Sequence, residues 1–179
     1  MKKPRLAVLT AMILTAAAAR LLPHPPNFTP IAAMALFGGA SFADRRLAFA
    51  VPLAALLLSD LCLGFYRLLP IVYGSFALIV CIGFWLRTRR RVLPVVVTAL
   101  AGSFLFFLIT NFGVWATGAL YPQTWSGLGN CYGAAIPFFR NTLLGDGVFT
   151  AMLFGGLALA EKHFPILRAP CTAAPVPCV

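Results

Sequence analysis

The chain has 179 residues, of which 61% are apolar and 10% are charged, and its formal net charge is +10. A soluble domain carries about 25% charged residues, so this composition excludes a soluble globular protein and indicates an integral membrane protein. The apolar residues stand in blocks of helical length, without the alternation of a transmembrane β-barrel, and we expect an all-α fold.

Six apolar blocks predict six transmembrane helices. In chain order they cover residues 5–22, 30–43, 47–65, 70–86, 92–118 and 136–160. With the N-terminus inside, every Lys and Arg except Arg20, Arg67 and Arg140 falls on the cytoplasmic side, as the positive-inside rule requires. We therefore expect a six-helix bundle over residues 1–164 with both termini cytoplasmic, then a disordered Pro/Ala-rich tail over 165–179. This topology accounts for the basic clusters, so we expect no nucleic-acid partner.

The first block has two open questions. Its basic start and Ala-rich end also describe a cleavable signal peptide, whose removal would leave five helices. We expect the block to be retained, because the other basic clusters already fix a consistent orientation. Small residues at Ala7, Ala11, Thr15 and Ala19 share one face, and such faces let helices approach closely in lipid. That face packs against the chain's own helices or against another subunit.

The second block is short. Thr29 before Pro30 predicts an N-cap and a helix start. Fourteen residues at ~1.5 Å each span ~21 Å, less than a ~30 Å hydrocarbon core. We therefore expect the preceding loop, "PHPPNFT", to dip into the membrane and form a wall of a pocket open to the outside. The alternative is a rigid surface turn over a thinned bilayer.

Two aspartates stand in apolar blocks: Asp60 near the outer end of the third helix, and Asp146 well inside the sixth. A charge at the centre of a membrane helix costs ~2.5–3.5 kcal/mol, so such a residue normally faces protein or water. Two explanations stay open. The aspartates contact a ligand, or they form structural ion pairs with Arg20, Arg67 or Arg140.

Residues 118–139 form the longest predicted outer loop. Its glycines and aromatic residues suit a flexible lid over a ring-shaped ligand, although interfacial anchoring explains the same aromatic residues. On the sixth helix, Thr142 and Thr150 share the face of Asp146. We expect no metal site and no haem, because metal-ligand spacing and a suitable histidine pair are lacking. No phosphate-binding loop occurs, so any ATP hydrolysis must come from partner chains.

Several sequence features carry a family resemblance. They are six helices within the chain, the small face of the first helix, and the segments "FTPIAAMALFGGASF", "LLLSDLCLGF" and "IPFFRNTLLGDGVFTAMLFGGL". Over residues 6–160 these features resemble the substrate-binding S components of energy-coupling-factor vitamin transporters. Through "RLLPHPPNFTPIAAMALFGG" and "LITNFGVWATGALYP" the chain more closely resembles an uncharacterised bacterial inner-membrane family.

The resemblance implies a multi-pass protein of the bacterial inner membrane that binds a vitamin or another small micronutrient for uptake, without a cofactor. It implies docking through Ala7 and Ala11 onto a transmembrane coupling subunit driven by two ATPases. We expect no enzyme activity. The alternatives are an intramembrane aspartyl protease in which Asp60 and Asp146 share a proton, and a structural membrane subunit without a ligand. The implied ligand-binding residues are Asn27, Asp60, Asn111, Tyr132, Arg140 and Asp146.

Overall fold

The computed structural model describes residues 3–89 and 91–168. Over these residues all regular structure is helical, which confirms the all-α prediction. The α-helices are α1 (Lys3–Ala19), α2 (Ile31–Ser41), α3 (Arg45–Leu63), α4 (Leu69–Trp85), α5 (Val92–Ala116) and α6 (Trp125–His163). Two short 3₁₀ helices follow α4 and α6, at Leu86–Thr88 and Pro165–Leu167.

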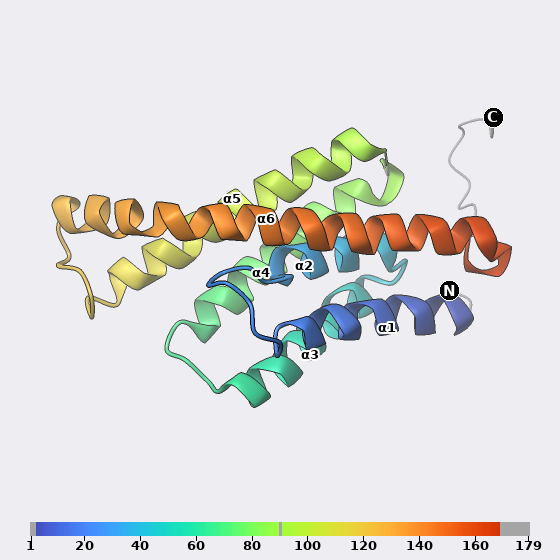
Figure 1. Ribbon diagram of the computed structural model, residues 1–179, viewed down its shortest axis with the longest axis horizontal. Coiled ribbons are helices and arrows are strands. Elements are labelled where there is room, and N and C mark those ends of the chain that lie inside the picture. Colours follow the sequence, from blue (N-terminus) through green and yellow to red (C-terminus); the bar gives the residue numbers. More distant parts are fainter. Residues whose placement is uncertain (1–2, 90, 169–179) are drawn as a thin grey trace.

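The short helix α2 lies at the centre, and the other α-helices pack around it (Figure 1). Every residue from Ile31 to Ser41 is buried. Its sequence, "IAAMALFGGAS", is apolar or small on all sides, and a helix of that kind is stable only when it is enclosed. α2 therefore serves as the core against which the longer helices are placed.

The closest approach in this core is between α2 and α4. A Cβ added at Gly39 would overlap the carbonyl oxygen of Val80 and lie 2.9 Å from Cα of Gly83. A Cβ at Gly83 would likewise meet the backbone of α2. The two glycines thus allow backbone contact between the helices, which is a common packing device in membranes.

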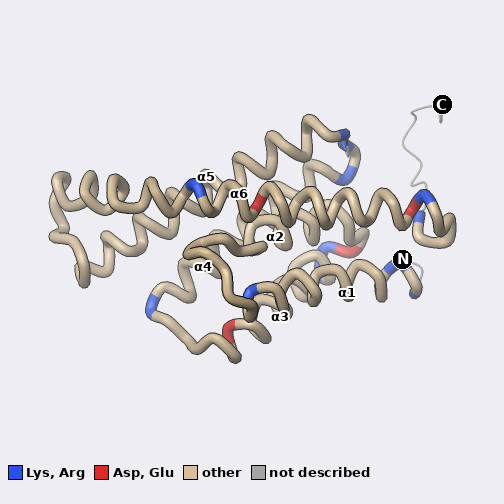
Figure 2. The backbone as a smooth tube through the Cα atoms, viewed as in Figure 1, with Lys and Arg blue, Asp and Glu red and all other residues tan. Residues whose placement is uncertain are grey.

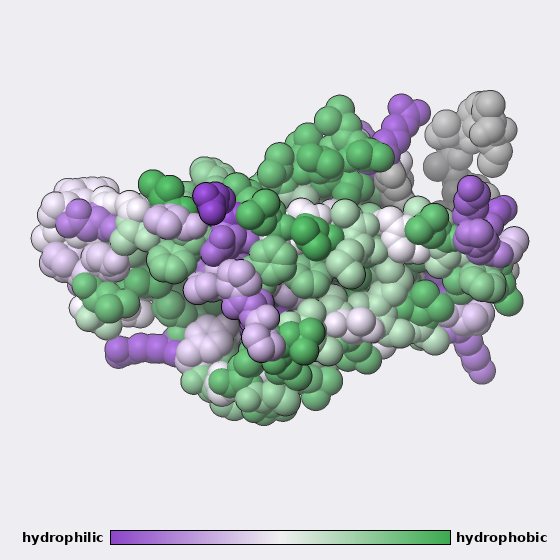
Figure 3. Space-filling model, in the orientation of Figure 1, coloured by the Kyte–Doolittle hydropathy of each residue, from purple (hydrophilic) through white to green (hydrophobic). Residues whose placement is uncertain are grey.

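The surface and the helix lengths are those of a helical membrane protein. α3, α4 with its 3₁₀ extension, α5 and α6 are each long and apolar enough to cross a membrane, whereas α2 is shorter. Hydrophobic side chains cover much of the face in Figure 3. In Figure 2, Lys and Arg gather toward the end of the molecule where α1 begins and α6 ends.

The predicted helix limits agree with the structure except at the start of α6. This helix begins at Trp125 and is 39 residues long, about 58 Å, so most of the predicted flexible lid is helical. The hydroxyl of Thr124 accepts a hydrogen bond from the Gly127 N–H (3.1 Å) and caps the helix. The prediction of a flexible lid over residues 118–139 is therefore wrong.

The segment after α6 packs back on the bundle. Arg5 of α1 is buried, and its guanidinium pairs with Glu161 Oε1 at 2.6 Å and donates to the carbonyl oxygen of Leu167. These contacts hold Pro165–Leu167 against α1 and α6. Of the predicted disordered tail, residues 169–179 lie outside the part of the chain that the structure describes.

Candidate ligand-binding site

A cavity of about 500 Å³ lies between α5 and α6. Its walls come from residues 92–103 of α5 and residues 143–161 of α6, and Ser41 at the end of α2 completes the lining. The two helices diverge toward the end where α5 begins and α6 ends (Figure 1), and the cavity occupies this divergence. Most of the lining side chains are apolar, so the few polar groups in it are conspicuous.

Asp146 is the most deeply placed charged group of the cavity. Its side chain is 3% exposed, and Ser103 Oγ donates to its Oδ2 at 2.6 Å. The backbone N–H groups of Ala32 and Ala33 also hydrogen-bond with the carboxylate. Those N–H groups belong to the first turn of α2, where they have no partner within the helix, and a negative charge there is favoured by the helix dipole.

Asp146 therefore caps α2 from another helix. The predicted N-cap at Thr29 is wrong, because Pro30 occupies the N-cap position and no local side chain bonds the first turn. Gly145 makes this approach possible: a Cβ at that position would lie 3.0 Å from the backbone nitrogen of Thr29. The absence of a side chain at Gly145 brings α6 against the loop that leads into α2.

Two residues that line the cavity have hydroxyl groups with no hydrogen-bond partner among the described residues. They are Thr150 Oγ1, one helical turn after Asp146, and Ser41 Oγ, and both residues are buried. Thr and Ser hydroxyls in helices commonly donate to the carbonyl four residues back, as Ser75 does to Ile71 at 2.8 Å. Both hydroxyl oxygens are buried, so a molecule in the cavity bonds them only after the side chains rotate toward it.

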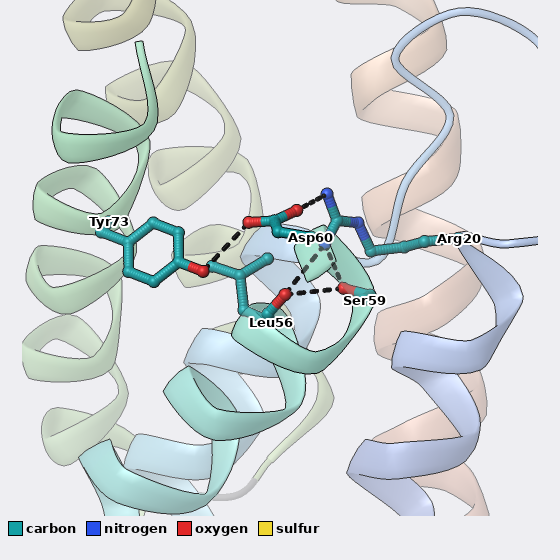
Figure 4. A network of polar contacts seen from close by, with 5 residues as sticks. All are labelled: Arg20, Leu56, Ser59, Asp60 and Tyr73. Atoms are coloured by element: carbon teal, nitrogen blue, oxygen red, sulfur yellow. Dashed lines mark hydrogen bonds and ion pairs between the residues drawn. The ribbon is translucent and has the colours of Figure 1, made fainter. Parts of the chain in front are cut away.

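Asp60 belongs to a different network, at the junction of α1, α3 and α4 (Figure 4). Arg20 Nη2 lies 2.7 Å from Asp60 Oδ1, and Tyr73 Oη donates to Oδ2 at 3.0 Å. The guanidinium also donates to Ser59 Oγ and to the carbonyl oxygen of Leu56. Asp60 is 0% exposed and Arg20 6%. For Asp60, the structure therefore supports the second explanation, a structural ion pair between helices.

The networks around the two aspartates share no residue. Asp60 is bonded by Arg20 and Tyr73, whereas Asp146 is bonded by Ser103 and the start of α2.

Tyr66 lies in the turn between α3 and α4, close to Asp60. Burial and then the Asp60 carboxylate raise the pKa of the Tyr66 phenol above its ordinary range, so this group stays neutral.

The other predicted ligand-binding residues are spread over the opposite end of α5 and α6 and the first loop. Asn111 Nδ2 donates to the carbonyl of Phe107 at 2.8 Å, and Asn111 lines a smaller hollow of about 180 Å³. Tyr132 Oη donates to the carbonyl of Leu108 at 2.7 Å. Arg140 is exposed. The structure therefore does not gather the six predicted residues into one site.

The loop "PHPPNFT" lies against α6. Asn141 Nδ2 donates to the carbonyl oxygen of Pro26 at 3.0 Å, and Phe28 packs on Phe149 with ring centroids 5.9 Å apart. Asn27 is exposed and has a left-handed backbone conformation with φ of 63°. The loop is thus tied to the helix that carries Asp146, although it does not line the larger cavity.

The small face of α1 points away from the bundle. Ala7 and Ala11 are exposed, while the side of α1 that faces the core is formed by Leu9, Ile13 and Ala16, all buried. Within the described part of the chain, this small face is therefore not used for internal packing.

The predicted set of ligand-binding residues did not include three polar residues that line the cavity: Ser41, Ser103 and Thr150. The four-residue spacing from Asp146 marks Thr150 in the sequence, because it places both on one helix face. Ser41 and Ser103 come from other helices, and their proximity depends on the packing of α2 and α5 beside α6.

Residues 1–167 match the family model DUF6580, a family of unknown function. No curated protein and no solved structure matches the chain. Neither a ligand nor a reaction follows from these comparisons.

Proposed function

Because the chain belongs to DUF6580, a family of unknown function, we propose its role from its geometry: it binds a small molecule between α5 and α6 for uptake. In this proposal it is the substrate-binding, S-component-like subunit of an uptake system for a vitamin or another small micronutrient. The observation that carries the proposal is the apolar cavity with a buried carboxylate and unpaired hydroxyls.

The cavity has the size and chemistry of a ligand site. Small-molecule pockets have volumes of roughly 300–1,000 Å³, with mostly apolar walls and a few placed polar groups, and they occur between the helices of bundles. A buried hydroxyl without a partner costs ~1–3 kcal/mol. Thr150 and Ser41 have buried hydroxyls of this kind within the described part of the chain. A ligand that bonds them recovers it, which favours the bound state.

The proposal places the protein in the bacterial inner membrane with six crossings and both termini cytoplasmic. Support comes from the basic residues gathered at one end in Figure 2. Along α6, the distance from Arg140 to Lys162 is about 33 Å, close to the ~30 Å of a hydrocarbon core. The part of α6 before Arg140 then projects outside the membrane, and Asp146 lies below the outer surface.

Uptake would need a partner. The chain has no phosphate-binding loop, so the proposal includes a transmembrane coupling subunit with two ATPases. Close approach of two helices in lipid requires small residues at the contact. The exposed face of α1 with Ala7 and Ala11 meets this requirement.

A substitution that fills the cavity tests the binding proposal. Ala151→Trp places a large ring in the cavity, and Ala101→Trp places the same ring on an exposed part of α5 that does not line it. Purified protein in nanodiscs is screened against a panel of B vitamins by the shift in melting temperature. We expect a vitamin that stabilises the wild type and Ala101→Trp but not Ala151→Trp. Equal stabilisation of both variants, or none of the wild type, would overturn the proposal.

A further inference from the structure

We propose that the cavity between α5 and α6 selects an amphipathic organic cation, whose protonated amine pairs with Asp146 while its apolar body lies along α5. This inference rests on the proposed function, because it names the ligand class of the same site.

The first step of the argument is the uncompensated charge. Within the described residues, the ion pairs are Arg5 with Glu161 and Arg20 with Asp60, and neither includes Asp146. The N-terminus of α2 supplies a charge of roughly +0.5, which balances only about half of a carboxylate. A buried charge without a counter-ion is costly, so a cationic ligand gains affinity by supplying one.

The second step is the acceptor capacity that remains. An ionised carboxylate has about four acceptor sites. Ser103 and the N–H groups of Ala32 and Ala33 use three of them. One site is left for a further donor, and Asp146 lines the cavity. An amine is a donor that satisfies this site and carries the missing positive charge.

The third step is the charge of the remaining wall. Among the described residues, no Lys, Arg or His lines the cavity, and its ionisable residues are Asp146 and Glu161. Glu161 lies at the far end, where Arg5 pairs with it at 2.6 Å. An anionic ligand would therefore enter beside a carboxylate, with no cation in the described part of the wall to receive it, and low polarity strengthens this repulsion.

The positions of the polar groups define the rest of the ligand. Thr150 lies on the same face of α6 as Asp146, one turn further along, and its free hydroxyl suits a second polar group close to the amine. Opposite stand Val95, Val96 and Ala99 of α5, which offer no hydrogen bonds. The ligand is thus polar at one end and apolar along one side.

Three naphthalene probes that differ in charge test the inference. At pH 7, 2-(1-naphthyl)ethylamine is a cation, 2-(1-naphthyl)ethanol is neutral and 1-naphthaleneacetate is an anion. Binding is measured by naphthalene fluorescence in phosphatidylcholine nanodiscs, and empty nanodiscs give the partition into lipid. We expect the amine to bind at least tenfold more tightly than the alcohol, and the acetate to bind most weakly.

Asp146→Asn should bring the amine and the alcohol to within about twofold, because the amide keeps an acceptor for α2 but loses the charge. Asp44→Asn is the matched control: it removes an exposed carboxylate at the N-cap of α3, where Asn caps equally well, and should keep the preference. Ser103→Ala retains the carboxylate, removes one donor and should preserve or increase the preference. It therefore tests the inference even if Asp146→Asn does not fold.

The outcomes separate the two proposals. Equal binding of all three probes that Ala151→Trp abolishes would overturn cation selectivity and leave the cavity as a ligand site. Loss of the amine preference in Ser103→Ala, or its survival in Asp146→Asn, would also overturn it. Absence of binding by every probe would reject the cation class. The vitamin screen on Ala151→Trp would then decide the proposed function separately.

Discussion

The ion pair between Arg20 and Asp60 allows a quantitative prediction. Asp60→Asn removes one charge and leaves the Arg20 guanidinium, which is 6% exposed, without a counter-ion. At the 2.7 Å between Nη2 and Oδ1 and an effective dielectric constant of 20, the two charges attract by about 6 kcal/mol. Desolvation of both ions offsets part of this gain, and one-sided loss of a buried pair typically costs ~3–5 kcal/mol. We expect Asp60→Asn to lower the free energy of unfolding by that amount.

Unfolding is followed by far-UV circular dichroism as the purified protein is titrated with sodium dodecyl sulfate in mixed micelles. Asp44→Asn serves as the control and should change the free energy of unfolding by less than ~0.5 kcal/mol. The double variant with Arg20→Gln should lose less than the sum of the two single variants, because no unpaired charge remains. A loss below ~1 kcal/mol for Asp60→Asn, or additive single effects, would refute the structural role of the pair.

The remaining predictions concern the partner and the topology. Ala11→Leu on the small face of α1 should weaken co-purification with a coupling subunit without changing ligand binding. The control Ala54→Leu, on an exposed part of α3, should leave co-purification unchanged. Equal effects of the two substitutions would show that the small face has no special role. An impermeant maleimide should label Ser126→Cys in intact cells and Thr88→Cys only after permeabilisation, since these exposed residues lie at opposite ends of the bundle. Labelling of Thr88→Cys in intact cells would contradict the proposed orientation.

The sequence predicted the helical class and most helix limits well, because apolar blocks must form helices whose backbone groups are paired in lipid. From α1 to α5, the predicted ends lie within three residues of those in the structure. The start of α6 escaped prediction because the segment from Trp125 to Cys131 is rich in Gly and polar residues. There the helix is supported by contacts with α5, including the bond from Tyr132 to Leu108.

The candidate site was harder to predict because its parts come from distant segments. Asp60 and its partner Arg20 were among the open alternatives, since opposite charges in apolar blocks tend to pair. The capping of α2 by Asp146 could not be read from local patterns, because Thr29 and Pro30 form a plausible local helix start. In the structure, α6 packs beside the start of α2, and Asp146 takes the place of the local cap.

The length of α6 has a mechanical consequence. Asp146 lies about 32 Å from the first residue of this helix and about 26 Å from the last. Its bonds to α2 and Ser103 hold the helix near this midpoint, which divides it into an outer arm and an inner arm. The inner arm is one wall of the cavity. The inner end is held as well, because Arg5 of α1 pairs with Glu161 at 2.6 Å. A tilt of 5° about Asp146 would displace the tip of the inner arm by about 2 Å and would therefore have to break this pair.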